Sequence, residues 1–151
     1  MKSKVNVLVK LLVLRDDTLL FGILNQEGKK VSGLPSFYPD AEKDFFKSLD
    51  TEIDSLFGVE IERFTYGPSF FHTSDNQTEL VSSIIIWIDS DSSPLTNDVF
   101  EEWKWVRPSL WKTKEWNEKF VFPDIEAKIF KKFDFSPHRW SGLMEKDRTY
   151  E

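Results

Sequence analysis

Apolar and polar residues in the first part of the chain follow patterns typical of two strands and then a loop. Val5 to Leu14 is rich in Val and Leu, and Thr18 to Leu24 is a second apolar run. Asp16 and Asp17 separate the two runs, so we predict strand, turn and strand. The polar stretch Asn25 to Lys30 predicts a loop before the next element.

Apolar residues then recur at helical spacing between Asp40 and Gly58, which predicts one amphipathic helix. Asp40 is the expected N-cap, with Lys43 rather than glutamate at the third position after it, so the capping box is incomplete. Gly58 is expected to end the helix. The core-facing stripe consists of Phe45, Leu49, Ile53, Leu56 and Phe57.

The second half of the chain predicts further strands and a closing helix. The turn Ser74 to Gln77 leads into a long apolar run that suits a buried central strand. Asp89 to Asp98 is rich in Asp and Ser and predicts a surface loop, with a carboxylate-rich metal loop as the less favoured alternative. Strands are expected at 59–71, Thr78 to Ile88 and Phe100 to Val106. A short helical turn is expected at 108–110. A helix is expected from Asp124 to Phe133, with Pro123 as the residue that initiates it.

Length and charge narrow the class of protein. A chain of 151 residues falls in the usual range of a single domain and can bury a sizeable core. Its formal charge of −6 gives no attraction for nucleic-acid phosphates or an anionic membrane, so neither partner is expected. The absence of cysteine excludes disulfides, thiolate zinc sites and cysteine nucleophiles.

The N-terminus resembles the start of a secretory signal but lacks the rest of one. Met1 to Lys4 is basic and precedes an apolar run, yet Lys10 interrupts that run and no small-residue cleavage site follows. The apolar run Ile84 to Ile88 is too short to span a bilayer. A strand at the N-terminus and a cytoplasmic location are therefore expected.

Residues 33–59 contain a loop and helix that match part of a known pattern, G-x5-E-x7-R-E-U-x-E-E-x-G-U, where U is a bulky apolar residue. When the pattern ends on Gly58 and Val59, four positions agree: Glu52, Ile53, Gly58 and Val59. The other fixed positions hold Phe37 for glycine, Lys43 for glutamate, Thr51 for arginine, and Ser55 and Leu56 for two glutamates. The segment resembles a degenerate Nudix box of MutT-like proteins.

The flanking segments extend this resemblance over residues 4 to 133. Nudix hydrolases place a β-hairpin before the box, Leu-Pro at its start, two long strands after it, and a Trp-containing strand before a final helix; all have counterparts here. The resemblance implies a Nudix-type α/β/α sandwich with a mixed β-sheet, formed by residues 1–133. Residues 134–151 would be a C-terminal extension. Its Phe135, Trp140 and Leu143 predict that part of it docks on the domain or across a homodimer interface, with a disordered tail as the alternative.

In the family, carboxylates on this helix hold Mg²⁺ or Mn²⁺ against a diphosphate. Residues three and four apart share a helix face, so Glu52, Ser55 and Leu56 are expected to point together, and only Glu52 is an acid. Asp50 and Asp54 would turn away from that face. Glu52 is thus the candidate metal ligand and catalytic base, with a solvated helix acid as the alternative; no cofactor is expected, and Mg²⁺ would be required if the protein is active.

Aromatic residues are abundant, with six Trp and fourteen Phe. Trp87 and Phe46 are expected in the core. The late group can pack in the core or at an interface, or stack on a nucleobase. The candidate ligand contacts are Trp103, Trp105 and Phe37, although a ring at position 37 would obstruct the close approach of backbone to phosphate that glycine allows. The late group comprises Trp103, Trp105, Trp111, Trp116 and Trp140.

The acid count favours a divergent Nudix-superfamily protein, a pseudoenzyme that binds a nucleotide-like or phosphorylated molecule with little or no diphosphate hydrolysis. One alternative is an active metal-dependent hydrolase of nucleoside diphosphate derivatives, with Glu52 assisted by Glu79, Glu101 or Glu102. Another is a protein-interaction module that uses the late aromatic residues and the tail. His72 is expected to be a surface or turn residue, and a metal site shared with the distant His138 is disfavoured.

Overall fold

In the computed structural model of the protein, the described residues are 5–16, 18–58, 63–88, 100–107, 110 and 113–132. Within them the chain forms seven strands and three helices. In chain order these are β1 (Asn6–Arg15), β2 (Thr18–Gln26), β3 (Lys29–Gly33), β4 (Ser36–Phe37), α1 (Phe45–Phe57), β5 (Arg63–Ser74), β6 (Gln77–Trp87), β7 (Glu102–Val106), α3 (Lys114–Lys119) and α4 (Asp124–Lys132).

The sheet is mixed, with one parallel pair at its centre. Its main strand order is β3-β2-β1-β6-β5, while β4 also pairs with β1 and β7 with β2. β1 and β6 run parallel from Asn6 opposite Glu79 to Leu14 opposite Trp87, and the other pairs are antiparallel. The apolar run of β6 is therefore buried between two neighbours, as the sequence predicted.

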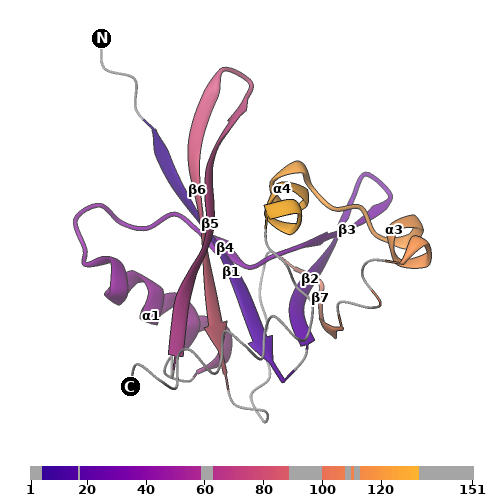
Figure 1. Ribbon diagram of the computed structural model, residues 1–151, viewed down its shortest axis with the longest axis horizontal. Coiled ribbons are helices and arrows are strands. Elements are labelled where there is room, and N and C mark those ends of the chain that lie inside the picture. Colours follow the sequence, from indigo (N-terminus) through magenta and orange to yellow (C-terminus); the bar gives the residue numbers. More distant parts are fainter. Residues whose placement is uncertain are drawn as a thin grey trace.

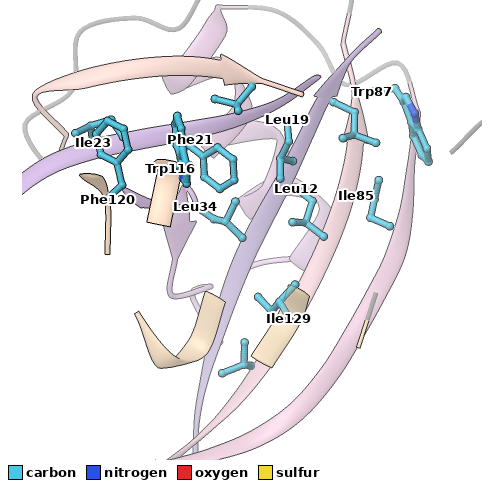
Figure 2. Packing of buried hydrophobic residues seen from close by; sticks show 13 residues of the cluster. Leu12, Leu19, Phe21, Ile23, Leu34, Ile85, Trp87, Trp116, Phe120 and Ile129 are labelled. Atoms are coloured by element: carbon cyan, nitrogen blue, oxygen red, sulfur yellow. The ribbon is translucent and has the colours of Figure 1, made fainter. Parts of the chain in front are cut away.

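Helices cover both faces of this sheet (Figure 1). Alternate residues of β1 point to opposite faces: Leu12 and Leu14 belong to the core cluster that includes α3 and α4, whereas Val9, Leu11 and Val13 belong to the cluster under α1. Figure 2 shows the first cluster, in which side chains of the sheet meet Trp116, Phe120 and Ile129. The predicted α/β/α sandwich with a mixed sheet is confirmed.

A buried ion pair fastens α4 to the centre of the sheet. The Lys10 ammonium of β1 lies against the Glu126 carboxylate of α4, and Glu126 is only 1% exposed. Lys10 interrupts the apolar pattern of β1 because it faces this carboxylate rather than solvent. The pair places a matched charge inside an otherwise apolar layer.

Helix α1 begins later than the sequence predicted. Its N-cap is Asp44, whose carboxylate accepts a hydrogen bond of 2.8 Å from the Phe46 amide. Asp40 instead forms a turn before the helix, where its carboxylate accepts from the Glu42 amide at 2.9 Å. Gly58 ends the helix as expected, with φ of +69° and its N–H donating to the Asp54 carbonyl.

Two other predictions near this region were wrong. The polar stretch at 25–30 is a hairpin turn rather than a loop, because β2 continues to Gln26, Glu27 and Gly28 make the turn with positive φ, and β3 starts at Lys29. Phe46, in the first turn of α1, is 48% exposed rather than core, and its ring packs at the surface on Phe64 of β5, with centroids 5.5 Å apart. Trp87 is buried as expected.

The second half agrees with the prediction in its strands and last helix. The Ser74 to Gln77 turn is present, with Asp75 and Asn76 at positive φ, and α4 follows Pro123. Helix α3 was not predicted. The loop 89–98, Val59, Trp111, His138 and the extension 134–151 lie outside the described residues. Among the described helices, none is both long enough and apolar enough to cross a membrane.

Candidate functional site

Glu52 lines a small cavity between α1 and the sheet. The cavity has a volume of about 110 Å³, and Glu52 and Leu56 form its helix side from successive turns of α1. The remaining described lining residues come from β1, from the β3–β4 connection and the first residue of β4, and from β7 and the segment before it. They are Leu11, Pro35, Ser36, Phe100 and Trp103. We call this cavity the Glu52 pocket.

The chemistry of the Glu52 pocket is that of one acid among apolar groups. Partial burial raises the pKa of the Glu52 carboxyl above its ordinary value. Within the described residues, Glu52 is the only acid that lines the cavity, whereas Asp50 and Asp54 are exposed on the outer side of α1, as predicted. Ser55 is also exposed and does not line the pocket, contrary to the expected grouping.

Phe100 fills part of the space beside this carboxylate. Its ring lies on the backbone of Gly22 in β2, where an added Cβ would overlap the ring, and near Gly33 of β3, where a Cβ would lie 3.4 Å from it. Gly22 and Gly33 are paired across β2 and β3, so together they make a flat floor for the ring. The Trp103 ring packs on the same ring, with centroids 5.0 Å apart.

Of the predicted ligand contacts, the structure brings only Trp103 to the Glu52 pocket. The Trp103 indole N–H is buried and has no acceptor within the described residues. Trp105, two positions further along β7, packs against Phe57 and lies under the Arg15 guanidinium, 4.1 Å from the ring centroid. Phe37 is 8% exposed and belongs to the core cluster under α1.

The acids proposed to assist Glu52 lie elsewhere. Glu79, at the start of β6, accepts a 2.6 Å hydrogen bond from the Tyr38 hydroxyl, and this bond raises the pKa of Tyr38. Glu102 lies 3.4 Å from the Lys104 ammonium, and Glu101 is exposed. No group of three or more His, Asp or Glu side chains suited to a metal occurs in the described part of the chain. This donor set does not fit Mg²⁺, which needs several oxygen ligands.

His72 lies on β5 rather than at a turn, and its Nδ1 is 3.0 Å from the Lys128 ammonium of α4. It is remote from the residues that line the Glu52 pocket. The sequence disfavoured a role for His72 as a metal ligand. In the structure the group beside its Nδ1 is the Lys128 ammonium.

Sequence reasoning missed Phe100 as a site residue. One signal was present: Gly22 stands inside the predicted strand Thr18 to Leu24, and glycine inside a strand often marks a place where another group approaches the backbone closely. The partner that makes this approach is distant in sequence and could not be identified from the pattern. As built, the pocket can accept a small group, offering it the Trp103 N–H, the Ser36 hydroxyl and the Glu52 carboxyl.

A scan against protein-family models finds no match, and a search of curated proteins finds none either. Solved structures do match. A MutT Nudix hydrolase from Burkholderia pseudomallei has a TM-score of 0.64 and 13% identity, covering 87% of this chain and 100% of its own. A possible asymmetric diadenosine tetraphosphate hydrolase from Jonesia denitrificans has a TM-score of 0.64 and 16% identity, and the match covers 85% of this chain and 92% of that one.

A third similar structure was determined with a ligand. It is the Nudix domain of NrtR from Shewanella oneidensis, complexed with ADP ribose, with a TM-score of 0.57, 8% identity and coverage of 72% of this chain and 76% of its own. At such identities the similarity concerns the path of the backbone. It leaves the chemistry of the pocket to be argued from this chain's own residues.

Proposed function

Because the chain has the fold of the Nudix hydrolases, we propose that it binds a nucleotide-like or other phosphorylated small molecule in the cytoplasm, with little or no hydrolysis of diphosphates. The observation that carries this proposal is the Glu52 pocket, in which Glu52 is the only acid among the described lining residues. Binding a ligand uses the same fold as hydrolysis. It does not require a metal to neutralise the negative charge that develops on phosphoryl oxygens during hydrolysis.

The lack of further acids among the described lining residues lowers the rate expected for diphosphate hydrolysis. A bound metal stabilises the negative charge that develops on phosphoryl oxygens, a contribution of several kcal/mol, and each 1.36 kcal/mol corresponds to about tenfold in rate. Leu56 replaces one of these acids with a buried apolar side chain that packs in the core under α1. Phe100 occupies adjacent space with a second apolar group. An apolar lining of this kind favours retention of a ligand over its cleavage.

The binding half of the proposal has support of its own. A protein of this fold, the NrtR Nudix domain, was determined with ADP ribose. In the present chain, the Trp103 N–H has no acceptor among the described residues, and an acceptor atom of a ligand could satisfy it. We propose Trp103 as the ligand contact in the Glu52 pocket, with Phe37 and Trp105 supporting the walls from the core.

A thermal-shift screen tests binding. Nucleotides and sugar nucleotides, ADP ribose among them, are added with and without Mg²⁺, and at least one should raise the melting temperature without Mg²⁺. The stabilising ligand should lose its effect in Trp103→Phe, which keeps an aromatic ring but removes the N–H donor. A screen in which no ligand raises the melting temperature would contradict the proposal.

Two further measurements separate a binder from an enzyme. Isothermal titration should give Mg²⁺ affinity no tighter than millimolar, and a micromolar affinity lost in Glu52→Ala would favour the active-hydrolase alternative. Hydrolysis of ADP ribose, diadenosine polyphosphates and nucleoside triphosphates should stay near background. Turnover above about 1 s⁻¹, a typical enzyme value, would establish that alternative.

A second candidate function, protein interaction, is favoured by the surface of β5. This strand ends the sheet, pairing only with β6 among the described strands, and its Tyr66 and Phe71 are 62% and 67% exposed. Exposed aromatic residues on an edge strand are typical of a surface that pairs with another chain. Sedimentation over about a hundredfold range of concentration should reveal a homodimer that Tyr66→Lys weakens; a constant monomer mass would rule out self-association.

A further inference from the structure

A second and larger cavity lies on the opposite face of the sheet from the Glu52 pocket. It has a volume of about 510 Å³ and lies between β7 and α3. Small-molecule sites commonly have volumes of about 300 to 1,000 Å³. The two cavities share no described lining residue. The lining residues of the larger one, which we call the α3 pocket, are Lys104, Leu110, Glu115, Trp116, Glu118, Lys119 and Phe120.

Two packed rings form the apolar wall of the α3 pocket. The Trp116 and Phe120 rings have centroids 4.4 Å apart, and both residues also belong to the core cluster of the sheet. Leu110 stands at the pocket with 49% of its surface exposed. A wall anchored in the core is rigid, and an exposed leucine beside it supplies apolar contact to a ligand.

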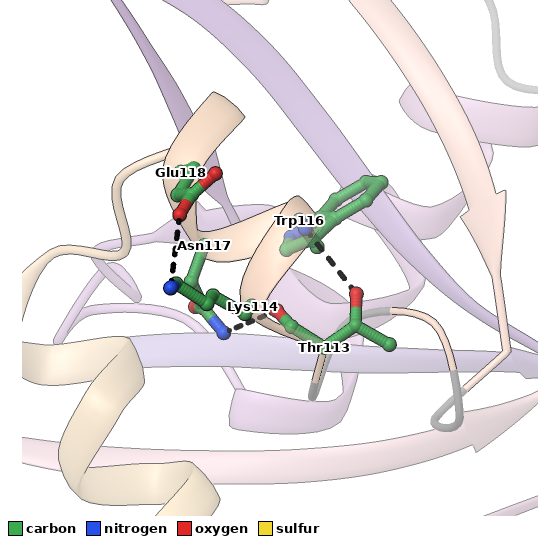
Figure 3. Close-up of polar contacts among 5 residues, drawn as sticks. All are labelled: Thr113, Lys114, Trp116, Asn117 and Glu118. Carbon is green, nitrogen blue, oxygen red and sulfur yellow. Dashed lines mark hydrogen bonds and ion pairs between the residues drawn. The ribbon is translucent and has the colours of Figure 1, made fainter.

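Helix α3 is held in place by its own polar contacts (Figure 3). Thr113 caps it: the hydroxyl accepts from the Trp116 amide at 3.2 Å, and the Thr113 carbonyl accepts from the Asn117 side-chain amide at 2.8 Å. Lys114 and Glu118 lie 3.8 Å apart, one turn from each other on the outer surface. These contacts fix the position of Trp116 at the start of the helix.

The polar groups of the α3 pocket are balanced in charge, and one donor is unused. Among the described lining residues, Lys104 and Lys119 balance the charges of Glu115 and Glu118, so this part of the lining gives no net attraction for an ion. The Trp116 indole N–H is buried and has no acceptor within the described residues. A buried donor without a partner is uncommon, and an acceptor atom of a ligand would satisfy it.

We propose that the α3 pocket binds an uncharged planar heteroaromatic molecule of about nucleoside size. The ring of the ligand packs against the wall of Trp116, Phe120 and Leu110. A ring nitrogen or carbonyl of the ligand accepts the Trp116 indole proton. This site is separate from the Glu52 pocket, and its occupation requires neither phosphate nor metal.

The test follows the indole N–H groups by NMR. The chain has six Trp, so ¹⁵N-indole labelling gives at most six side-chain signals, and the Trp116 signal is assigned by its loss in Trp116→Phe. Adenosine, the neutral aromatic probe, should shift the Trp116 signal saturably. Ribose, which lacks the aromatic ring, should leave it in place. An unmoved Trp116 signal, or an equal shift with ribose, would overturn the proposal.

Variants and a charged probe sharpen the result. Trp116→Phe keeps the ring wall and should weaken adenosine binding about three- to tenfold, the range for loss of one neutral hydrogen bond. Leu110→Ser changes an exposed residue and should weaken binding without affecting the fold, so it serves if Trp116→Phe fails to fold. Val5→Ser, a matched control at a similarly exposed apolar residue outside the described lining of both cavities, should leave the affinity unchanged. AMP binding more than about tenfold tighter than adenosine would contradict a charge-balanced site.

Discussion

Partial burial disfavours the charged form of the Glu52 carboxyl and raises its pKa. A raised pKa means that the folded protein loses stability as pH rises and this group ionises, whereas below its ordinary pKa the group is protonated in both states and the penalty is absent. Glu52→Gln should therefore raise the melting temperature at pH 7 by a small amount, and this gain should fade on acidification to about pH 4. Melting curves of the variant and the wild type across this range measure the effect.

Asp50→Asn is the matched control, because Asp50 lies on the exposed side of the same helix. It should give no comparable pH-dependent gain. Equal gains in both variants would mean that the net charge of the helix, rather than the burial of Glu52, sets the stability.

Gly22 is required by the ring that lies on it. A methyl group at this position would overlap the Phe100 ring, so Gly22→Ala should cost about 1 to 3 kcal/mol of unfolding free energy, the range for overpacking. In a Phe100→Ala background the ring is absent and the same change should cost much less. Urea unfolding of the four proteins in this double-mutant cycle gives the coupling, and additive costs would show that the contact is not the cause.

At the residue scale, the sequence could predict only part of the site. Glu52 was identified because it matches a glutamate of the Nudix box that the segment resembles, and the structure places it in a pocket with Leu56. Phe100 was missed because its contact with Gly22 joins residues nearly eighty positions apart, which no local pattern records. Of the predicted aromatic contacts, Trp103 lines this pocket, while the ligand-binding roles of all three remain predictions.

At the element scale, the cap of α1 gives a direct test of where the helix begins. Asp44→Ala removes the acceptor of the Phe46 amide and should cost about 1 kcal/mol, the typical value for an N-cap. Asp40→Ala, the position that the sequence favoured, should cost less because Asp40 caps only a turn. Chemical denaturation measures the loss of unfolding free energy in both variants. A larger loss in Asp40→Ala would mean that α1 begins near Asp40, as the sequence predicted.

Most elements were predictable because their signals are local. The β1 and β6 runs, the turn at Asp75 and Asn76, and the C-cap at Gly58 follow from apolar runs and turn residues. Helix α3 was missed because it is only six residues long, and its buried residue, Trp116, was considered only as one of the late tryptophans. The start of α1 was misplaced because two aspartates four positions apart both suit a cap.

At the scale of the whole molecule, the Lys10–Glu126 pair joins the sheet to α4. Removing one partner leaves an uncompensated buried charge, so Glu126→Leu or Lys10→Met alone should cost about 3 to 5 kcal/mol. Replacing both with apolar residues should recover most of that loss. Thermal or chemical unfolding of the single and double variants tests this. If the two residues contributed independently, the losses of unfolding free energy in the single variants would add in the double variant.

The layer arrangement was also predictable, because the family resemblance supplied the order of elements along the chain and implied an α/β/α sandwich with a mixed sheet. The charge pair across the layers was not, since a lysine inside an apolar run gives no indication of its partner. Long-range pairing of this kind depends on the assembled fold. It becomes visible only when α4 is placed on the sheet.

The parallel pairing of β1 with β6 also constrains how the chain acquires its fold. Leu8 lies beside Val81, about 73 positions later, so the centre of the sheet cannot close until α1 and β5 have both been made. At a synthesis rate of about 5 to 20 residues per second, β1 waits roughly 4 to 15 s on the ribosome with one edge unoccupied. Such distant contacts also slow refolding relative to proteins dominated by local contacts. During that interval, the most apolar strand of the newly made chain is exposed to chaperones and to other unfinished chains.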